Sequence, residues 1–320
     1  MNGVVHSASN VRQIVPSRLL LYAGLLYVIV AWALNTVFVK QAVTHIDPLA
    51  FTFIRFLAMT PLAFGLARAA KHRIHIARRD VPLLILCGAC GYGIYQYFWI
   101  IGLSHTTAFA SALLGALSPI FTLSIVAILG LERVRSGRWA GAGIALLGIA
   151  IFEGAFSGAA TFRVGDLLTL GAALVFAVYT VVSARLLDRY TPLELLAITM
   201  AIGTVMIAPG GVPALLHTNL AHLSWDIWWR LIYATIFPIL LTYPVWSYGI
   251  TQIGAGRVSL FGFLVPIVAG ALSIPILHAR FAPYELAGAA VCLLGMLVSN
   301  ILGRVSLTAM WAQRTLPFER

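Results

Sequence analysis

Long apolar stretches alternate with short polar gaps along nearly the whole chain. Each stretch is about 20 residues long, and a helix rising ~1.5 Å per residue would then cross the ~30 Å hydrocarbon core of a bilayer. We therefore predict an all-α integral membrane protein with ten transmembrane helices. The predicted spans are 19–39, 48–68, 81–103, 106–130, 138–155, 165–187, 192–214, 228–250, 255–278 and 284–303.

Composition supports this prediction, because 61% of the 320 residues are hydrophobic and only 10% are charged. Soluble proteins carry roughly 25% charged residues. Helices and turns use up the chain, so only residues 1–18 and 304–320 are expected outside the bundle. The first span lacks the small-residue cleavage site of a signal peptide, and we interpret it as a retained helix.

The three cysteines, Cys87, Cys90 and Cys292, all fall inside predicted spans. A Cys-x-x-Cys pair can bind a metal, but neither a second pair of ligands nor a histidine cluster accompanies it in the sequence. We interpret the cysteines as small apolar packing residues, and we expect neither a metal nor another cofactor.

The net charge of +11 would suggest a nucleic-acid partner in a soluble protein, but here the basic residues lie in the gaps between spans. If the amino terminus is cytoplasmic, sixteen of the 21 fall on the cytoplasmic side; Lys40, Arg163, Arg230 and Arg280 fall outside, and Arg55 lies within a span. Cytoplasmic segments of membrane proteins are enriched in Lys and Arg. We predict that both termini face the cytoplasm and that the protein binds no nucleic acid.

The second half of the chain repeats the first. A shift of 147 positions aligns residues 99–148 with 246–295 without a gap, and fifteen of the fifty pairs are identical. A shift of 144 aligns the preceding helices and pairs Pro48 with Pro192. The identical pairs include Trp99/Trp246, Gly102/Gly249, Gly115/Gly262, Pro119/Pro266, Arg133/Arg280, Gly141/Gly288 and Gly148/Gly295.

Each copy contains five spans, so copies at 19–155 and 164–303 cross the membrane in opposite orientations. Inverted repeats recur in secondary transporters, because two related packings can open a central site alternately to each side. We therefore predict two inverted five-helix repeats around a central cavity that carries a small-molecule solute. A duplication with a merely structural role is the alternative.

Several motifs are spread over residues 19–303. They are Trp32-Ala33-Leu34-Asn35 with Lys40, Arg55-Phe56, Leu117-Ser118-Pro119, Gly130-Leu131-Glu132-Arg133, Gly165-Asp166-Leu167-Leu168, Leu264-Val265-Pro266 and the Gly288-to-Gly295 pattern. Together they resemble the drug/metabolite transporter superfamily, in its branch of paired five-helix EamA-type units. The second copy departs from this family where Leu277-His278-Ala279-Arg280 lacks the acid of Gly-Glu-Arg, which weakens a general role for Glu132.

This resemblance implies export of amino acids, including aromatic ones, or of similar metabolites from the bacterial inner membrane, in contact with lipid. The motifs do not fix the substrate, so export of drugs or other metabolites stays an alternative. An intramembrane enzyme would call for a motif such as His-Glu-x-x-His or Gly-x-Ser-x-Gly, which the sequence lacks. A channel would need a continuous polar pore.

The third predicted span places Tyr92, Tyr95, Gln96 and Trp99 on one helix face. Rings with a polar tip suit a cavity for flat or apolar solutes. The tryptophans near span ends could equally serve as anchors at the membrane interface. Further candidates for the cavity lining lie on the first, fourth, sixth, eighth and ninth spans: Trp32, Asn35, Ser111, Tyr179, Ser183, Tyr243, Trp246 and Ser259.

Arg55 lies about seven residues inside its span, where a charged side chain costs roughly 2.5–3.5 kcal/mol. It could meet a substrate carboxylate or helix-end carbonyls. Because the family that the sequence resembles commonly carries an arginine there whatever its solute, we favour the structural role. We interpret Lys40, at the outer end of the first span, as an interfacial anchor first and an entrance charge second.

All ten acidic residues fall at predicted helix ends or in gaps, so none lies at mid-membrane. Proton-driven carriers usually relay protons through a buried acid or histidine. We therefore expect a facilitator or exchanger driven by the gradient of its own solute.

Prolines inside predicted spans remove a backbone hydrogen bond and favour kinks. Pro119 and Pro266 are repeat partners, and we predict that they act with Pro244 as hinges; static kinks are the equal alternative.

Small residues also form two helix faces, Gly137-x-x-x-Gly141 and Gly288-x-x-x-Cys292. Such faces allow helices to approach closely, either within one fold or in a homodimer.

Overall fold

The computed structural model describes residues 18–70, 74–131, 136–156, 163–253 and 261–302. The described residues form helices and connecting turns, and no β-strand occurs among them. Six helices are long and apolar enough to cross a membrane, and three shorter helices are also apolar. These findings confirm the predicted all-α membrane fold.

The α-helices of the described chain are α1 (Arg18–Ala42), α2 (Pro48–Ala69), α3 (Val81–Gly88), α4 (Ile94–His105), α5 (Ala108–Gly115), α6 (Ser118–Ile128), α7 (Ser136–Phe152), α8 (Val164–Leu186), α9 (Pro192–His217), α10 (Trp225–Thr235), α11 (Thr242–Ile253), α13 (Leu264–Leu277) and α14 (Pro283–Leu302). Shorter segments are the 3-10 helices η1 (Arg78–Asp80) and η3 (Leu220–His222) and the π-helices η2 (Ala89–Gly93) and η4 (Ile236–Leu241). Three crossings are composite: α3 with η2 and α4, α5 with α6, and α10 with η4 and α11. The described chain therefore contains the ten predicted crossings.

Equivalent helices begin with similar local signals in the two repeats. In α2, Pro48 follows Asp47, whose side chain accepts hydrogen bonds from two N–H groups of the first turn. In α9, Pro192 follows Thr191, which forms a reciprocal capping box with Glu194. A capping side chain satisfies otherwise free N–H groups, and proline fits the first helical position. The shift that aligns the two prolines therefore aligns two helix starts.

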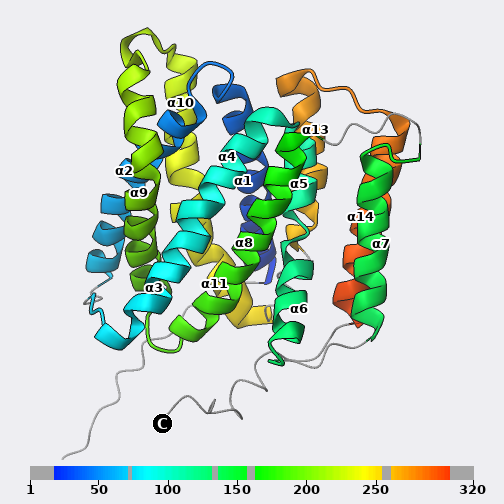
Figure 1. Cartoon of the computed structure of the whole chain (residues 1–320), viewed down its shortest axis with the longest axis horizontal. Coiled ribbons are helices and arrows are strands. Elements are labelled where there is room, and N and C mark those ends of the chain that lie inside the picture. Colours follow the sequence, from blue (N-terminus) through cyan, green and yellow to red (C-terminus); the bar gives the residue numbers. More distant parts are fainter. Residues whose placement is uncertain (1–17, 71–73, 132–135, 157–162, 254–260, 303–320) are drawn as a thin grey trace, which may run out of the picture.

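Successive crossings alternate between the two ends of the bundle (Figure 1). We call the end that contains residues 42–48 the upper end, as it is drawn there. Helix α7 pairs with α14 at one side of the bundle, and α2 packs against α9. Helix α1 packs against α13 and α11, whereas α8 packs against α6 and α4. Exchanging the first five crossings with the last five maps the α7–α14 and α2–α9 contacts onto themselves and the contacts of α1 onto those of α8.

The contact between α7 and α14 shows this symmetry at the level of single atoms. A Cβ atom added at Gly148 would lie 2.2 Å from the backbone nitrogen of Cys292, and one added at Gly295 would lie 2.2 Å from that of Ala145. The shift of 147 carries Gly148 to Gly295 and Ala145 to Cys292, so the two contacts are equivalent. A second reciprocal pair of close approaches is Gly141 with Ser299 and Gly288 with Phe152. Both predicted small-residue faces thus pack within the fold.

Helices α2 and α9 also meet through equivalent residues. The hydroxyl oxygens of Thr60 and Thr204 are hydrogen-bonded at 2.8 Å, and the shift of 144 pairs these two positions. Equivalent residues touch each other only close to a two-fold axis. Because the paired helices α7 and α14 run in opposite directions, this axis lies across the helix direction. The repeats are therefore inverted, as predicted.

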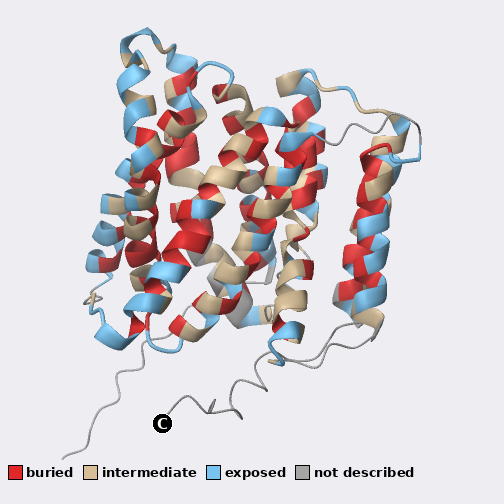
Figure 2. Ribbon diagram, in the orientation of Figure 1, coloured by how far each residue is buried: buried red, intermediate tan, exposed pale blue. Residues whose placement is uncertain are grey.

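Buried residues concentrate where helices face one another, and exposed residues cover the outer faces of the bundle (Figure 2). Many of those exposed residues are large and apolar, including Leu57, Leu146 and Val205. An apolar exterior of this kind suits hydrocarbon rather than water.

Candidate functional site

Two π-helical segments interrupt the third and eighth crossings at equivalent positions. Segment η2 covers Ala89–Gly93, and η4 covers Ile236–Leu241. The shift of 147 places residues 89–93 on 236–240, so the interruption belongs to the repeated unit. π-Helical turns are frequent at functional sites. Many of the residues predicted to line the cavity gather around these two segments.

At η2, the ring of Tyr179 from α8 packs onto the backbone of Gly91. A Cβ atom at Gly91 would lie 2.4 Å from this ring, so a larger residue would displace it. Tyr92 packs edge-on against Tyr179 with ring centroids 5.7 Å apart, and the Tyr95 ring lies 5.1 Å from that of Phe176. The structure therefore brings Tyr92, Tyr95 and Tyr179 together as an aromatic wall between the third and sixth crossings.

At η4, Pro238 lacks the N–H group that an α-helix would donate to the carbonyl of Ala234. Arg55 on α2 donates from Nη2 to this carbonyl oxygen at 2.9 Å. The carbonyl oxygen of Pro238 accepts from Trp32 Nε1 at 2.9 Å and from Thr242 Oγ1 at 2.7 Å. Side chains of the first repeat therefore stabilise the interrupted crossing of the second.

The two predicted lining tryptophans Trp32 and Trp246 form a pair across the two halves. Their ring centroids lie 4.9 Å apart, with the rings tilted by 48°. Trp99, the repeat partner of Trp246, packs instead against an apolar cluster that contains Val39 and Ile100. The structure thus separates two tryptophans that the repeat alignment makes equivalent.

Three predicted lining residues bury a polar atom that lacks a hydrogen-bond partner: Asn35 Oδ1, Gln96 Oε1 and Ser111 Oγ. The Gln96 residue is only 5% exposed. Leaving a buried polar group unpaired costs roughly 1–3 kcal/mol, so each such atom calls for an explanation. A solute that donates hydrogen bonds inside the bundle would satisfy the two amide oxygens.

Arg55 is 1% exposed and combines a structural contact with free hydrogen-bond donors. Its Nη2 atom serves the Ala234 carbonyl, while Nε and Nη1 have no partner. Its guanidinium also lies 5.6 Å from the ring centroid of Phe51. Free N–H groups on a buried cation form a strong receptor for an anion such as a carboxylate.

Lys40 lies at the upper end of α1, next to the end of α4. Its Nζ atom donates to the carbonyl oxygens of Leu103 at 2.9 Å and Ser104 at 3.0 Å. These carbonyls belong to the last turn of α4, where a cation is favoured by the helix dipole. The geometry fits the anchoring role that we favoured from the sequence.

Other predicted residues have contacts within their own helix or lie near helix starts. Ser183 donates to the carbonyl of Thr180 on its own helix at 3.2 Å. Pro119 is the second residue of α6, just after the break between α5 and α6, and Pro266 lies in the first turn of α13.

Three predicted positions receive no side-chain description. Tyr243 and Pro244 belong to α11, but their side chains fall outside what the structure describes. Ser259 lies outside the described residues.

Sequence reasoning missed the two π-helical segments and the contact of Arg55 with the Pro238 break. One signal was present for η2, because Gly88, Gly91 and Gly93 crowd into an otherwise apolar span. Isolated glycines within a helical pattern often mark a close approach of another element. Ile202, Tyr179 and Met206 make those approaches at Gly88, Gly91 and Gly93 respectively.

The model of the EamA-like transporter family matches residues 19–153 and again residues 163–301. These two matches include all ten crossings and cover most of the chain. The chain belongs to the EamA-like transporter family. This EamA protein is therefore a membrane transporter of small molecules, as the repeat and the motifs predicted, and it is not an intramembrane enzyme.

Relatives of this EamA protein include two with functional names. The "Probable terminal-alkyne amino-acid exporter" of Streptantibioticus cattleyicolor is 31% identical over 71% of this chain and 76% of its own length. The "Probable amino-acid metabolite efflux pump" of Salmonella typhimurium is 26% identical over 89% of this chain and 96% of its own length. The "Uncharacterized transporter YyaM" of Bacillus subtilis is 26% identical over 76% of this chain.

A solved crystal structure has the same fold as this EamA protein. It superposes with a TM-score of 0.64 and covers 90% of this chain and 99% of its own. At 20% sequence identity, this likeness concerns the fold alone.

Proposed function

We propose that this EamA transporter exports amino acids, including aromatic ones, or closely related metabolites. The observation that carries the proposal is the set of buried polar atoms without a hydrogen-bond partner on Asn35, Gln96 and Arg55. The two amide oxygens accept hydrogen bonds, and the Arg55 N–H groups donate them. An amino acid offers the complementary pair, an ammonium donor and a carboxylate acceptor.

The aromatic wall suits the remaining part of such a solute. Tyr92, Tyr95 and Tyr179 present ring faces and edges that pack with apolar or aromatic side chains. Two relatives are named for export of amino acids or their metabolites, which agrees with this solute class.

We infer that the two units are residues 19–155 and 164–303, with segments 1–18 and 304–320 on the cytoplasmic side of a bacterial inner membrane. The excess of Lys and Arg in the gaps at the lower end supports this orientation. The upper end, with Lys40, then faces outward.

Exchange of the two related packings between the halves would expose the site first to one side and then to the other. We propose Pro119, Pro266 and Pro244 as the bends at which this exchange occurs. Pro119 lies in the first turn of α6 beside a helix break, which is where a change of angle disturbs the fewest hydrogen bonds. Movement down the solute's own gradient needs no further coupling group.

The proposal is tested with purified protein in liposomes and a panel of labelled phenylalanine, tryptophan, leucine, phenethylamine and glucose. We expect saturable transport of the amino acids and weak transport of phenethylamine, which lacks the carboxylate. Saturation distinguishes a carrier from a channel. Transport of the amine with no transport of any amino acid would contradict the proposed solute class. An absolute need for an imposed pH gradient would contradict the facilitator mechanism.

A further inference from the structure

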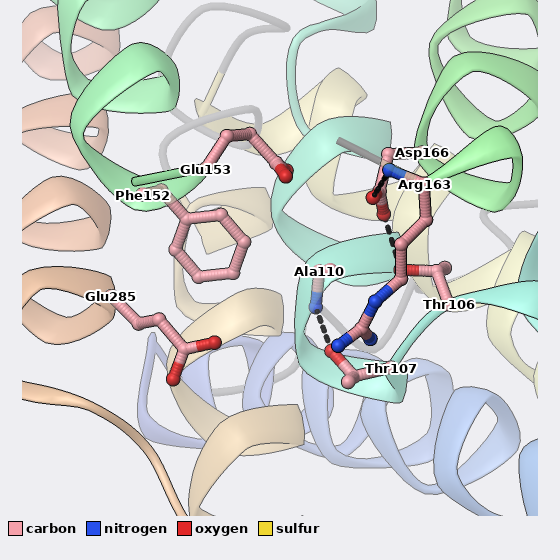
Figure 3. A pocket seen from close by; sticks show the side chains of 8 residues that line it. All are labelled: Thr106, Thr107, Ala110, Phe152, Glu153, Arg163, Asp166 and Glu285. Carbon is pink, nitrogen blue, oxygen red and sulfur yellow. Dashed lines mark hydrogen bonds between the residues drawn. The ribbon is translucent and has the colours of Figure 1, made fainter. Parts of the chain in front are cut away.

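A small pocket lies at the upper end, where the α7–α14 pair meets the rest of the bundle (Figure 3). Its volume of about 20 Å³ accommodates one water-sized occupant and excludes an amino acid. It is therefore separate from the site proposed for the transported solute. The lining residues are Thr106, Thr107, Ala110, Phe152, Glu153, Arg163, Asp166 and Glu285.

Two of the three carboxylates in this pocket have firm hydrogen-bond partners. Asp166 accepts from the Thr106 hydroxyl, and also from the Arg163 backbone N–H at 2.8 Å, so it caps α8. Glu285 accepts from the backbone N–H of Ala282 at 2.6 Å at the start of α14. Both carboxylates therefore serve as helix caps.

The third carboxylate, Glu153, is buried without a partner for one of its oxygens. It follows the last residue of α7, is 7% exposed, and its side chain points toward the pocket (Figure 3). Its Oε1 atom has no hydrogen-bond partner. An ionised carboxylate in this state is costly, and binding a proton removes the charge.

The charges that face Glu153 come from two of the elements that border the pocket. Helix α8 and its N-cap contribute Asp166 and Arg163, and α14 contributes Glu285. The turn between α4 and α5 contributes only threonines; the neighbouring His105 is exposed and does not line the pocket. Three acids against one arginine give a surplus of negative charge, which favours a positively charged occupant.

We propose that this upper pocket is a proton-binding site, with Glu153 as the acceptor, that makes the junction between the α7–α14 pair and the bundle sensitive to pH. When Glu153 is protonated, the junction contains a neutral carboxylic acid. When Glu153 is ionised, the carboxylates at the end of α7, on α8 and on α14 repel one another, and the junction loosens.

The pKa of Glu153 agrees with this proposal. Burial and then the charge of Asp166 raise it, Arg163 opposes the rise, and Glu285 adds to it, with a result of about 7. The site also belongs to one end only, because the repeat shift of 147 places the uncharged Asn300 opposite Glu153. With the orientation proposed above, the sensitive end faces outward.

The sign of the pH effect follows from proton binding. The folded protein holds a proton between pH 4.5 and about pH 7 that the glutamate of the unfolded chain, titrating at its ordinary value, has released. The contribution of Glu153 to stability is therefore greatest at the acidic end of this window. It declines as the pH rises through the window and is constant above it.

The test is the unfolding temperature of the purified full-length protein in lipid nanodiscs at a series of pH values, without any solute. Because no transport is measured, its outcome is independent of the solute class proposed above. We expect the wild-type unfolding temperature to fall by several degrees between about pH 5 and about pH 8. In Glu153→Gln, a neutral mimic of the protonated acid, this pH-dependent fall of the unfolding temperature should disappear. The matched control Asp226→Asn changes an exposed acid at the same end and should show the same fall as the wild type.

Two further variants keep the test decisive if Glu153→Gln does not fold. Removing a neighbouring negative charge in Glu285→Gln should move the midpoint of the fall to lower pH. Removing the positive charge in Arg163→Gln should move it to higher pH. A wild-type unfolding temperature that does not change over this range, a full pH-dependent fall in Glu153→Gln, or unmoved midpoints in both charge variants would each overturn the proposal.

Discussion

Arg55 donates a hydrogen bond to the carbonyl oxygen of Ala234, the backbone acceptor that Pro238 cannot serve. A side chain from the first repeat therefore stabilises a break in the backbone of the second. The same guanidinium keeps Nε and Nη1 free. Structure and solute binding thus meet in one residue, and the two roles make different predictions.

The structural role predicts an energetic coupling between Arg55 and Pro238. Arg55→Met removes both the cost of a buried charge and the hydrogen bond to Ala234. These two effects on stability oppose each other, so the stability of this single variant does not test the structural role. Pro238→Ala restores an N–H group that can serve the same carbonyl. We expect Arg55→Met to be better tolerated in the Pro238→Ala background, with a coupling of about 1 kcal/mol in a double-mutant cycle of thermal stability. Additive effects would show that the two residues act independently.

The binding role predicts a loss of transport without a loss of stability at Gln96. Gln96→Leu removes a buried oxygen that has no partner in the structure, so the free energy of unfolding should stay the same or rise. A solute that donates to this oxygen should then bind less well, with KM raised roughly tenfold for about 1.4 kcal/mol of lost interaction. Gln252→Leu, an exposed glutamine on α11, is the matched control and should leave KM unchanged. A Gln96→Leu protein with normal KM would remove Gln96 from the binding site.

The reciprocal glycines predict equal costs in the two repeats. Gly148→Ala and Gly295→Ala each place a methyl group 2.2 Å from a backbone nitrogen, so α7 and α14 must move apart. We expect both to lower the free energy of unfolding by about 1–3 kcal/mol. Gly143 lies on α7 like Gly148, but a Cβ atom added there would meet open space, so Gly143→Ala should be neutral or slightly stabilising. Unfolding by heat or detergent measures all three, and equal losses at 143 and 148 would argue against the close contact.

Lys40 should contribute to stability rather than to solute entry. Lys40→Met leaves the Leu103 and Ser104 carbonyls without their donor, and we expect a cost of about 1 kcal/mol in thermal stability with normal transport. Lys40→Arg keeps a positive donor and should recover most of the loss. A transport defect in Lys40→Met at unchanged stability would instead identify an entrance charge.

Much of the fold could be predicted from the sequence because the membrane restricts what a chain can do. Backbone groups in hydrocarbon have to be paired within a helix, so apolar length translates directly into crossings. The repeat then predicted that the two halves are inverted, because a copy with an odd number of crossings leaves the next copy to start on the opposite side of the membrane. Helix interruptions were harder to foresee: the crossing at 106–130 reads as one apolar span, yet it divides before Ser118.

The site was less predictable, because periodicity identifies a helix face but not what that face meets. Tyr92, Tyr95 and Tyr179 do come together, since their helices pack side by side. Trp99 and Trp246 are equivalent in sequence, yet Trp246 meets Trp32 while Trp99 enters an apolar cluster. That difference depends on neighbours from distant helices, which no local pattern contains. Glu153 was classed correctly as a helix-end residue, but its burial depends on residues from the α4–α5 turn, α8 and α14 that border the same pocket.

Helix α14 leaves the ribosome after α7, so α7 is made before its packing partner exists. Roughly 130 residues separate the two helices. At a synthesis rate of ~5–20 residues per second, α7 therefore lacks its packing partner α14 for on the order of ten seconds. During that time lipid or an insertion factor has to cover the α7 face at Gly141 and Gly148 that later packs against the α14 backbone. Proteins truncated before Pro283 should therefore be cleared by the cell even though nine of the ten crossings are complete.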